Sequence, residues 1–311
     1  MKIALGHFLK LIRWPNLLMT AIAISVHWYF LLYLPIIAYG LIPGMDIFGI
    51  LLLGLNFAMV MGAGYVINDI RDVAIDKINR GSTQIIDNHI PIQQGKQIYI
   101  LLNLGAVVMT GLIAYKYQAY NNFYWLAIAI SILYIYSAFL KRKAFIGNLV
   151  IAILCGAVLL LPYAMEYHII ARMNVQLKGQ ITIQFFGCGL IALLLSLCRE
   201  ITKDQQDILG DQAFGARTLP IIWGPKHTNY FIAGFNLVTL STLYFLIKHI
   251  QPDTAGLMVV AIIMAVPLSY ISYLLIYSAM PVGYQKASSI YKFVMAIGMV
   301  LLPIVLSQIK H

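Results

Sequence analysis

Long runs of apolar residues, separated by short polar segments, make up most of the chain. A helix needs about 20 apolar residues to cross the hydrocarbon core of a bilayer. Nine runs come close to or exceed that length, and they predict helices near residues 15–38, 46–67, 97–115, 121–140, 145–165, 180–198, 228–248, 255–278 and 289–309. The pattern therefore predicts an all-α, polytopic membrane protein with nine transmembrane helices.

The composition agrees with this pattern. Hydrophobic residues make up 61% of the 311 residues and charged residues 10%, whereas soluble domains carry about 25% charged residues. No segment resembles a soluble domain, so we expect residues 1–311 to form a single integral-membrane domain. The first apolar run is long enough to span and follows Lys10 and Arg13, which argues against a cleavable signal peptide. The three cysteines lie in apolar runs without metal-ligand spacing, and we expect them to be small buried hydrophobes.

Basic residues predict the orientation of the helices. With nine spans, 16 of the 21 Lys and Arg residues lie at the N-terminus or in the loops after spans two, four, six and eight. Such loops face the cytoplasm, so we expect the N-terminus and these loops on the cytoplasmic side of the cell (inner) membrane. The net charge of +10 reflects this asymmetry and contact with anionic lipid headgroups, and we expect no nucleic-acid partner.

Acidic residues are scarce, and six of the nine aspartates lie in two segments that share one spacing, i, i+3 and i+7. The first set is Asp69, Asp72 and Asp76, and the second set is Asp204, Asp207 and Asp211. On a continuous helix these positions fall within an arc of roughly 60°, so each set is expected to form a row on one helix face. Glu200 lies in the second acidic segment, and the four remaining carboxylates are expected in ordinary surface loops: Asp46, Asp87, Glu166 and Asp253.

Both sets begin where a predicted span ends, which places them near the mouth of the helix bundle. Two rows of negative charge repel each other unless a cation lies between them. Mg²⁺ prefers oxygen ligands and is usually held by one or two carboxylates together with substrate phosphates. Basic residues accompany both sets, among them Arg71 and Lys77 near the first and Arg217 near the second. These features predict Mg²⁺ ions that bridge the carboxylates and a diphosphate.

A diphosphate at the mouth of an apolar bundle implies a lipid tail inside it, so the expected donor is a polyprenyl diphosphate. Metal ions would stabilise the departing diphosphate, and a dry pocket would protect the resulting allylic cation from water. Tyr65, Tyr134 and Tyr136 are candidates to face that cation with their rings.

Several motifs resemble the UbiA-type intramembrane prenyltransferases over most of the chain. Asn68, Asp69, Asp72 and Asp76 match the N-D-x-x-D-x-x-x-D signature of that family, and Lys77-Ile78-Asn79-Arg80 continues it. Tyr136-Ser137-Ala138-Phe139-Leu140-Lys141-Arg142, followed by Gly147-Asn148, and the second set, followed by Arg217-Thr218-Leu219-Pro220, also resemble family motifs. The resemblance implies an all-helical fold around a central cavity that faces the cytoplasm, Mg²⁺ dependence and an isoprenyl diphosphate donor.

The segment Arg199–Asp211 is similar to the branch that prenylates geranylgeranylglyceryl phosphate, as is Ile12–Leu18. The resemblance thus implies a geranylgeranyl donor and this lipid acceptor, with an aromatic acceptor of quinone biosynthesis as the alternative. One departure concerns the loop after Arg80. The family usually continues there with proline and a second arginine, but this chain has Gly81-Ser82 and, farther on, His89. Without the second arginine, this loop would lack one of the diphosphate contacts that the resemblance implies.

These inferences yield a set of candidate residues. The candidate metal ligands are Asp69, Asp72, Asp76, Asp204, Asp207 and Asp211, and the candidate catalytic residues are Asp72 and Asp207. The candidate substrate-binding residues are Asn68, Arg80, Tyr136, Lys141 and Lys203.

Two other classes of protein fit less well. A cation transporter would carry its acids near the bilayer midplane, between broken helices, but here they lie at one end among Lys and Arg residues. A phosphatidyl-group transferase would carry a D-x-x-D-G-x-x-A-R pattern, which this chain lacks.

Overall fold

The structure is a computed structural model that describes residues 4–79, 81–250, 254–277 and 281–307. These residues form helices and two isolated β-bridges. Within the described ranges, nine segments are long and apolar enough to cross a membrane. They are Trp14–Ala38, Ile47–Arg71, Ile92–Tyr117, Asn122–Leu140, Ile146–Ile170, Val175–Gln206, Leu219–His249, Met258–Tyr277 and Val282–Ser307. The prediction of an all-α protein with nine spans is confirmed, although several helices extend beyond their apolar runs.

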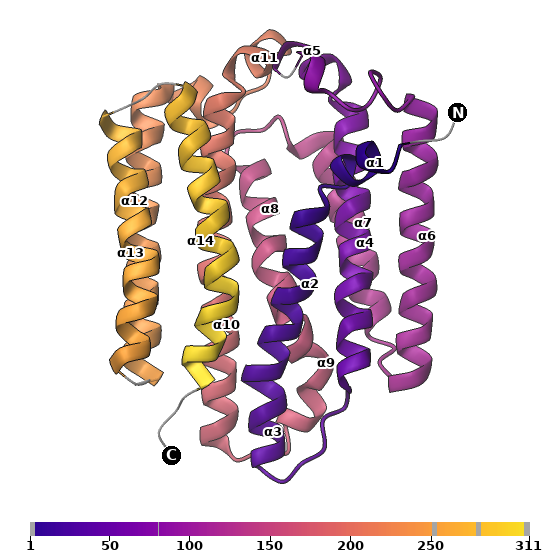
Figure 1. The fold of residues 1–311 in the computed structure, drawn as a ribbon, viewed down its shortest axis with the longest axis vertical. Coiled ribbons are helices and arrows are strands. Elements are labelled where there is room, and N and C mark those ends of the chain that lie inside the picture. Colours follow the sequence, from indigo (N-terminus) through magenta and orange to yellow (C-terminus); the bar gives the residue numbers. More distant parts are fainter. Residues whose placement is uncertain (1–3, 80, 251–253, 278–280, 308–311) are drawn as a thin grey trace. The chain divides into compact units, whose positions relative to one another are not determined.

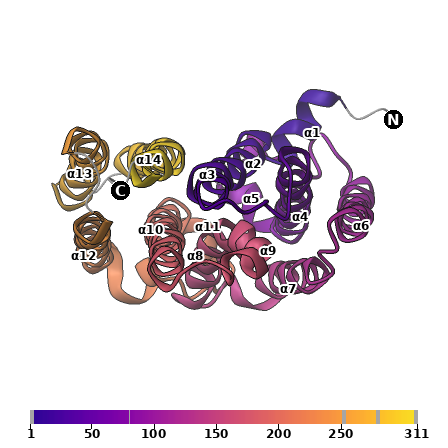
Figure 2. The same ribbon diagram turned by 90° about the horizontal axis from the view of Figure 1, so that it is seen from below.

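The chain divides into two compact units, and the first comprises Met1–Ile22, Met45–Gly147 and Leu209–Arg217. Its main helices are α4 (Ile47–Arg71), α6 (Ile92–Tyr117) and α7 (Asn122–Ile135), and α4 packs against both of the others (Figures 1 and 2). Its shorter elements are α1 (Leu5–Leu11), α5 (Val73–Asn79), η2 (Gly81–Thr83), the π-helical η3 (Tyr136–Leu140) and most of α11 (Ile208–Ala213).

Small residues bring the helices of the first unit close together. A side chain at Gly54 of α4 would come within 3.2 Å of the backbone of Ala21, which lies in α2 (Trp14–Trp28). Close backbone approach of this kind drives helix packing in membranes, because lipid tails compete with apolar side chains for contact. Beside it, Val60, Ala106 and Leu126 form a buried cluster between α4, α6 and α7.

The second unit comprises Ala23–Gly44, Asn148–Ile208 and Thr218–His311. Its longest helices are α10 (Val175–Gln206), α12 (Leu219–Ile250), α13 (Thr254–Tyr277) and α14 (Pro281–Ser307). α10 packs against α12 and α14, and α13 packs against the same two helices (Figure 2). The remaining elements are the π-helical η1 (Tyr29–Tyr33), α3 (Leu34–Ala38), α8 (Ile146–Ala157), η4 (Val158–Leu160) and α9 (Leu161–Ile170).

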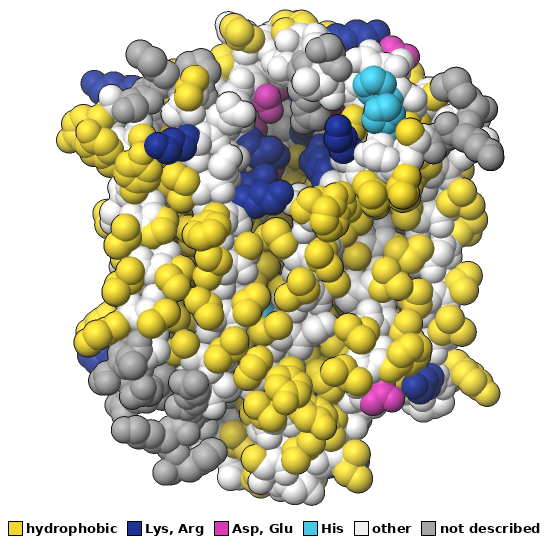
Figure 3. Space-filling model, viewed as in Figure 1, with side chains coloured by type: hydrophobic (Ala, Val, Ile, Leu, Met, Phe, Trp, Pro, Cys, Tyr) yellow, Lys and Arg dark blue, Asp and Glu magenta, His cyan; other side chains and the backbone are white. Residues whose placement is uncertain are grey.

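A kink near the start of α12 explains one difference from the predicted spans. Gly224 has a φ of +77°, which glycine adopts without strain, and Pro225 follows it. The expected span near 228–248 therefore continues a helical segment that already begins at Leu219. On the face shown in Figure 3, hydrophobic side chains cover the length of the helices, as contact with lipid requires.

Glu166 contradicts the expectation that the carboxylates outside the two aspartate sets lie in surface loops. The fifth span continues to Ile170, so Glu166 is part of α9, and its side chain is fully buried. Its carboxylate accepts hydrogen bonds from Trp28 Nε1 at 3.2 Å and from the Gly44 backbone N–H at 2.7 Å. A buried carboxylate is tolerated only with such partners, and this one ties α9 to the segment that follows the first span.

Asp46 meets the expectation, because it is an exposed residue at the start of α4. It is the N-cap of this helix, and its Oδ1 accepts a hydrogen bond from the Gly49 N–H at 2.8 Å. The Tyr117 hydroxyl also donates to it, and Lys116 Nζ lies 3.4 Å away. The hydrogen bond from Tyr117, followed by that from Gly49, lowers the pKa of Asp46 below its usual value. Asp253 lies outside the described residues, and Asp87 pairs with Lys77 at 3.0 Å on the surface.

We predict that Glu166→Ala destabilises the protein strongly. The change leaves the Trp28 and Gly44 donors buried without an acceptor, and each such donor costs on the order of 1–3 kcal/mol. Thermal unfolding in detergent micelles measures the loss. Asp87→Asn is the matched control, because it removes only a surface ion pair, worth no more than about 1 kcal/mol, and asparagine tolerates the left-handed backbone at this position (φ +78°). Equal unfolding temperatures for the two variants would contradict this account of Glu166.

We also predict a pH-dependent contribution from Asp46. Because its folded-state pKa is lowered, its stabilising effect is present above its unfolded pKa of about 3.9 and is lost as the pH falls through the folded value. Asp46→Ala should cost about 0.5–2 kcal/mol at pH 7 through the lost cap, and the difference from wild type should shrink near pH 3. Denaturant unfolding at both pH values tests this. Asp46→Asn keeps a capping acceptor and should be insensitive to pH; a constant wild-type advantage over Asp46→Ala would refute the prediction.

Candidate functional site

The two aspartate sets share a local backbone geometry that differs from the expected one. α4 ends at Arg71, and Asp72 follows with φ −94° and ψ 5° before α5 begins at Val73. α10 ends at Gln206, and Asp207 follows with φ −98° and ψ 6° before α11 begins at Ile208. The expected row on one continuous helix is therefore wrong for both sets, since the helix is interrupted at the middle aspartate.

The side-chain chemistry of aspartate favours this break. Aspartate is a weak helix former because its short carboxylate competes for nearby backbone donors. Each middle aspartate nevertheless closes the preceding helix, since the Asp72 N–H donates to the Asn68 carbonyl and the Asp207 N–H donates to the Lys203 carbonyl. As a result, the first aspartate of each set lies on a long helix and the third lies on a short one.

The first set is buried and is held by basic side chains of the first unit. Asp69, Asp72 and Asp76 are exposed by only 8%, 4% and 6%. Arg13 Nη2 lies 2.7 Å from Asp69 Oδ1, and Lys141 Nζ forms a hydrogen-bonded ion pair with Asp72 Oδ2. Lys141, a predicted substrate-binding residue, thus contacts one of the predicted metal ligands. In the sequence, Arg13 is a basic residue before the first span and part of the segment Ile12–Leu18. Nothing there indicated its contact with Asp69.

The second set is half-buried and is divided between the units. In the second unit, Asp204 accepts a hydrogen bond from Asn148 Nδ2 at 2.8 Å. Lys203, a predicted substrate-binding residue, pairs with Glu200 at 2.9 Å on the same helix. Asp207 belongs to the same unit, whereas Asp211 belongs to the first.

Within the first unit, the structure brings the helix of Asp211 against that of Asp76. The Gly210 N–H donates to Asn79 Oδ1 at 2.9 Å, and a Cβ at position 210 would come within 2.4 Å of the same atom. Only glycine allows this contact. The Asn79–Gly210 link went unrecognised in the sequence, although both residues occur in the motifs.

Aromatic residues near the first set are already in contact with basic side chains. The Arg13 guanidinium lies 4.4 Å from the ring centroid of Tyr65, and that of Arg71 lies 4.7 Å from the ring centroid of Tyr134. A guanidinium group of the protein therefore lies over one face of each of these two rings. Tyr136 begins the π-helical η3, and Arg80 lies outside the described residues. His89 stacks on His7, with ring centroids 4.1 Å apart.

The first set has the donor chemistry that Mg²⁺ requires. Its carboxylate oxygens are the hard ligands that this ion prefers. In addition, Asn68 Oδ1 is buried and has no hydrogen-bond partner in the described structure, so it offers an acceptor to a cation or to a metal-bound water. Among the described residues, no three His, Cys, Asp or Glu side chains are gathered closely enough to hold a metal ion.

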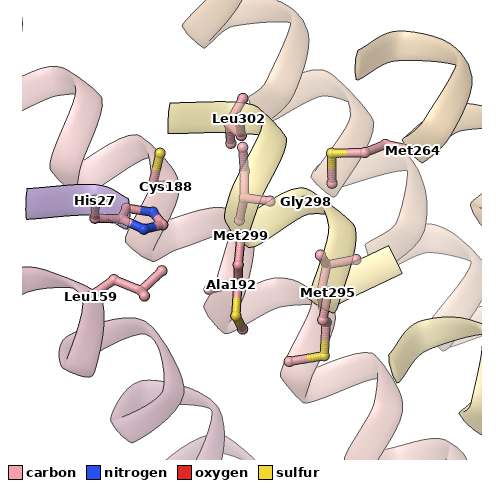
Figure 4. Close-up of a pocket in the computed structure, with 11 residues that line it drawn as sticks. His27, Leu159, Cys188, Ala192, Met264, Met295, Gly298, Met299 and Leu302 are labelled. Carbon is pink, nitrogen blue, oxygen red and sulfur yellow. The ribbon is translucent and has the colours of Figure 1, made fainter. Parts of the chain in front are cut away.

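A separate apolar pocket lies in the second unit. Figure 4 shows His27, Cys188, Met264, Met295 and Met299 around it. The Nδ1 atom of His27 lies 2.8 Å from the Ala23 carbonyl, so Nδ1 carries the proton when this buried ring is neutral. The lining contains neither carboxylates nor Lys or Arg, and the pocket therefore suits hydrocarbon better than a metal ion or a phosphate. The three cysteines are free, with Cys188 and Cys198 buried as expected and Cys155 partly buried.

This chain is similar to known proteins in both sequence and fold. A digeranylgeranylglyceryl phosphate synthase of Methanococcus aeolicus is 28% identical over 246 residues, which cover 77% of this chain and 76% of the relative. A solved structure described as "Structural and mechanistic insights into the biosynthesis of Digeranylgeranylglyceryl phosphate synthase in membranes" matches with a TM-score of 0.61 and 25% identity, covering 98% of this chain and 99% of its own.

A second solved structure shares the fold at lower identity. It is a UbiA homolog from Archaeoglobus fulgidus bound to GPP and Mg²⁺, with a TM-score of 0.53 and 16% identity over 97% of this chain and 99% of its own. The model of the UbiA prenyltransferase family matches residues 28–281, which include all six candidate aspartates. The chain is therefore an intramembrane prenyltransferase and belongs to the UbiA prenyltransferase family.

Proposed function

We propose that this prenyltransferase transfers a geranylgeranyl group from its diphosphate to geranylgeranylglyceryl phosphate. The diphosphate donor is supported by the buried carboxylates of the first set and by their cationic partners, Arg13 and Lys141. The name of the Methanococcus relative supports the acceptor, as does the form of the second motif. The alternative acceptor, an aromatic quinone precursor, has no comparable support.

The bond changes follow from the chemistry of the substrates. The bond between C1 of the geranylgeranyl group and the diphosphate oxygen breaks, and the electron pair leaves with the diphosphate. A glycerol hydroxyl then attacks C1, an ether bond forms and the hydroxyl proton is released. The products are an ether lipid and inorganic diphosphate. A pocket that keeps water away from C1 prevents hydrolysis of the donor.

We propose that the six aspartates hold Mg²⁺, with Asp72 and Asp207 the most sensitive positions. Bound Mg²⁺ supplies positive charge that neutralises the leaving diphosphate. Asn68 offers an oxygen ligand, and Lys141, Lys203 and Arg80 donate to diphosphate oxygens. The rings of Tyr65, Tyr134 and Tyr136 stabilise positive charge on the allylic group. Cations are needed beside the aspartates, because carboxylates alone would repel the negatively charged donor.

We further propose that residues 1–311 form one catalytic domain in the cell membrane, with the N-terminus and both aspartate sets on the cytoplasmic side. The distribution of Lys and Arg residues supports this orientation. A diphosphate donor made in the cytoplasm would then reach the aspartates without crossing the bilayer.

We predict that Asp72→Asn and Asp207→Asn each reduce transfer by about 10²–10³-fold, because each removes a carboxylate that is proposed to hold the Mg²⁺ that neutralises the leaving diphosphate. Transfer of radiolabelled geranylgeranyl groups by purified protein measures the effect, and thermal unfolding checks that the variants fold. Asp87→Asn, on the surface beside Lys77, is the matched control and should retain full activity. Undiminished turnover in both folded variants would remove the aspartates from the mechanism.

We predict that transfer to geranylgeranylglyceryl phosphate requires Mg²⁺. The assay compares this acceptor with an aromatic quinone precursor, each with and without a chelator. Product that forms only with the lipid acceptor and disappears with the chelator is the expected result. Product with the aromatic acceptor alone would assign the protein to the quinone branch instead.

A further inference from the structure

Arg13 occupies an unusual position in the backbone. It connects α1 to α2 with a φ of +53°, a left-handed conformation that residues other than glycine adopt rarely. Residues held in such conformations cluster at functional sites. The guanidinium is fixed on two sides, by Asp69 Oδ1 at 2.7 Å and by the Tyr65 ring at 4.4 Å. Asn16 Nδ2 in turn donates to the Tyr65 hydroxyl at 3.1 Å, so the ring that supports Arg13 is itself held in place.

Lys141 reaches Asp72 from a second unusual element. It follows directly after η3, a π-helical turn that closes with a hydrogen bond from the Lys141 N–H to the Tyr136 carbonyl at 3.0 Å. Such turns are rare and occur frequently at functional sites. The Asp72 side chain is 5% exposed, whereas that of Lys141 is 32% exposed. The lysine therefore covers the carboxylate from the accessible side.

These two contacts place protein cations on the same oxygens that Mg²⁺ would bind. A free divalent ion would have to displace a charge-assisted hydrogen bond at each carboxylate and then lie close to two positive side chains. Diphosphate changes this balance, because it offers Arg13 and Lys141 new acceptors and adds negative charge beside the metal.

We propose that Arg13 and Lys141 are resident counter-cations, which hold Asp69 and Asp72 until a diphosphate arrives and so make metal binding depend on that diphosphate. The proposal rests on the proposed function, because it assumes that these aspartates serve a diphosphate-bound metal. Arg13 and Lys141 act here as positioning residues, in addition to any contact of theirs with the donor. If they had only a structural role, the dependence of metal affinity on diphosphate would not change when they are replaced.

The test is a titration of the purified, full-length protein with Mn²⁺, followed by electron paramagnetic resonance, with and without inorganic pyrophosphate. For wild type we expect weak binding of Mn²⁺ alone and, after correction for the Mn²⁺–pyrophosphate complex in solution, affinity on the order of tenfold higher with pyrophosphate. Lys141→Met and Arg13→Gln should each bind Mn²⁺ alone several-fold more tightly and lose most of this coupling.

Two matched variants control for net charge. Lys143→Met and Lys10→Gln remove exposed basic residues near the same elements and should behave like wild type, whereas Arg13→Lys and Lys141→Arg keep the charge and should retain the coupling. If folded Lys141→Met and Arg13→Gln bind Mn²⁺ alone no more tightly than the controls, the proposal is wrong. Tight binding of Mn²⁺ to wild type without pyrophosphate would overturn it even if those variants failed to fold.

The outcomes separate this proposal from the proposed function. Pyrophosphate-dependent Mn²⁺ binding without transfer to either acceptor would leave the counter-cations in place and refute the acceptor assignment. Normal transfer with pyrophosphate-independent Mn²⁺ binding would refute the counter-cations alone.

Discussion

A carboxylate that leaves water must find a positive or hydrogen-bonding partner, and in this chain that requirement shapes the regions around the scarce acids. Asp69 and Asp72 are buried against Arg13 and Lys141. Glu166, in the other unit, is buried against Trp28 and Gly44. With charged residues making up only 10% of the sequence, each of these partners organises the backbone around it. The left-handed turn at Arg13 and the π-helical turn before Lys141 place the two cations on the first set.

The same requirement assigns different tasks to similar residues. Glu166 has neutral donors and connects two segments of its unit, as a structural residue does. The first aspartate set has cationic partners that other ligands can replace, which suits a site that must exchange its contacts. Asp46 lies in water and serves as a helix cap. Sequence position alone does not separate these roles, because all of these carboxylates lie at or near the end of an apolar run.

The fold could be predicted well because hydropathy reports directly on the length of a helix in a bilayer. The identity of the aspartates could be predicted because acids are scarce and their spacing repeats. The breaks at Asp72 and Asp207 could not, since three aspartates at i, i+3 and i+7 also suit an unbroken helix. Nor could the burial of Glu166, because it depends on a helix that continues five residues past the expected end, from 165 to Ile170. The contact of Arg13 with Asp69 could not be predicted either, because it depends on a left-handed backbone conformation that arginine rarely adopts.

The interruption at Asp72 places the outer two aspartates of the first set on two helices of very different length. Asp69 belongs to a helix of 25 residues, whereas Asp76 belongs to one of seven. Because α5 is separate from α4, the position of Asp76 is set by the short helix and by its contact with α11 through the Asn79–Gly210 hydrogen bond. The placement of the outer carboxylates therefore depends on two separate sets of contacts, the packing of α4 against α6 for Asp69 and the link between α5 and α11 for Asp76. In a continuous helix, the separation between the carboxylates of Asp69 and Asp76 would instead be set by the geometry of the whole membrane span.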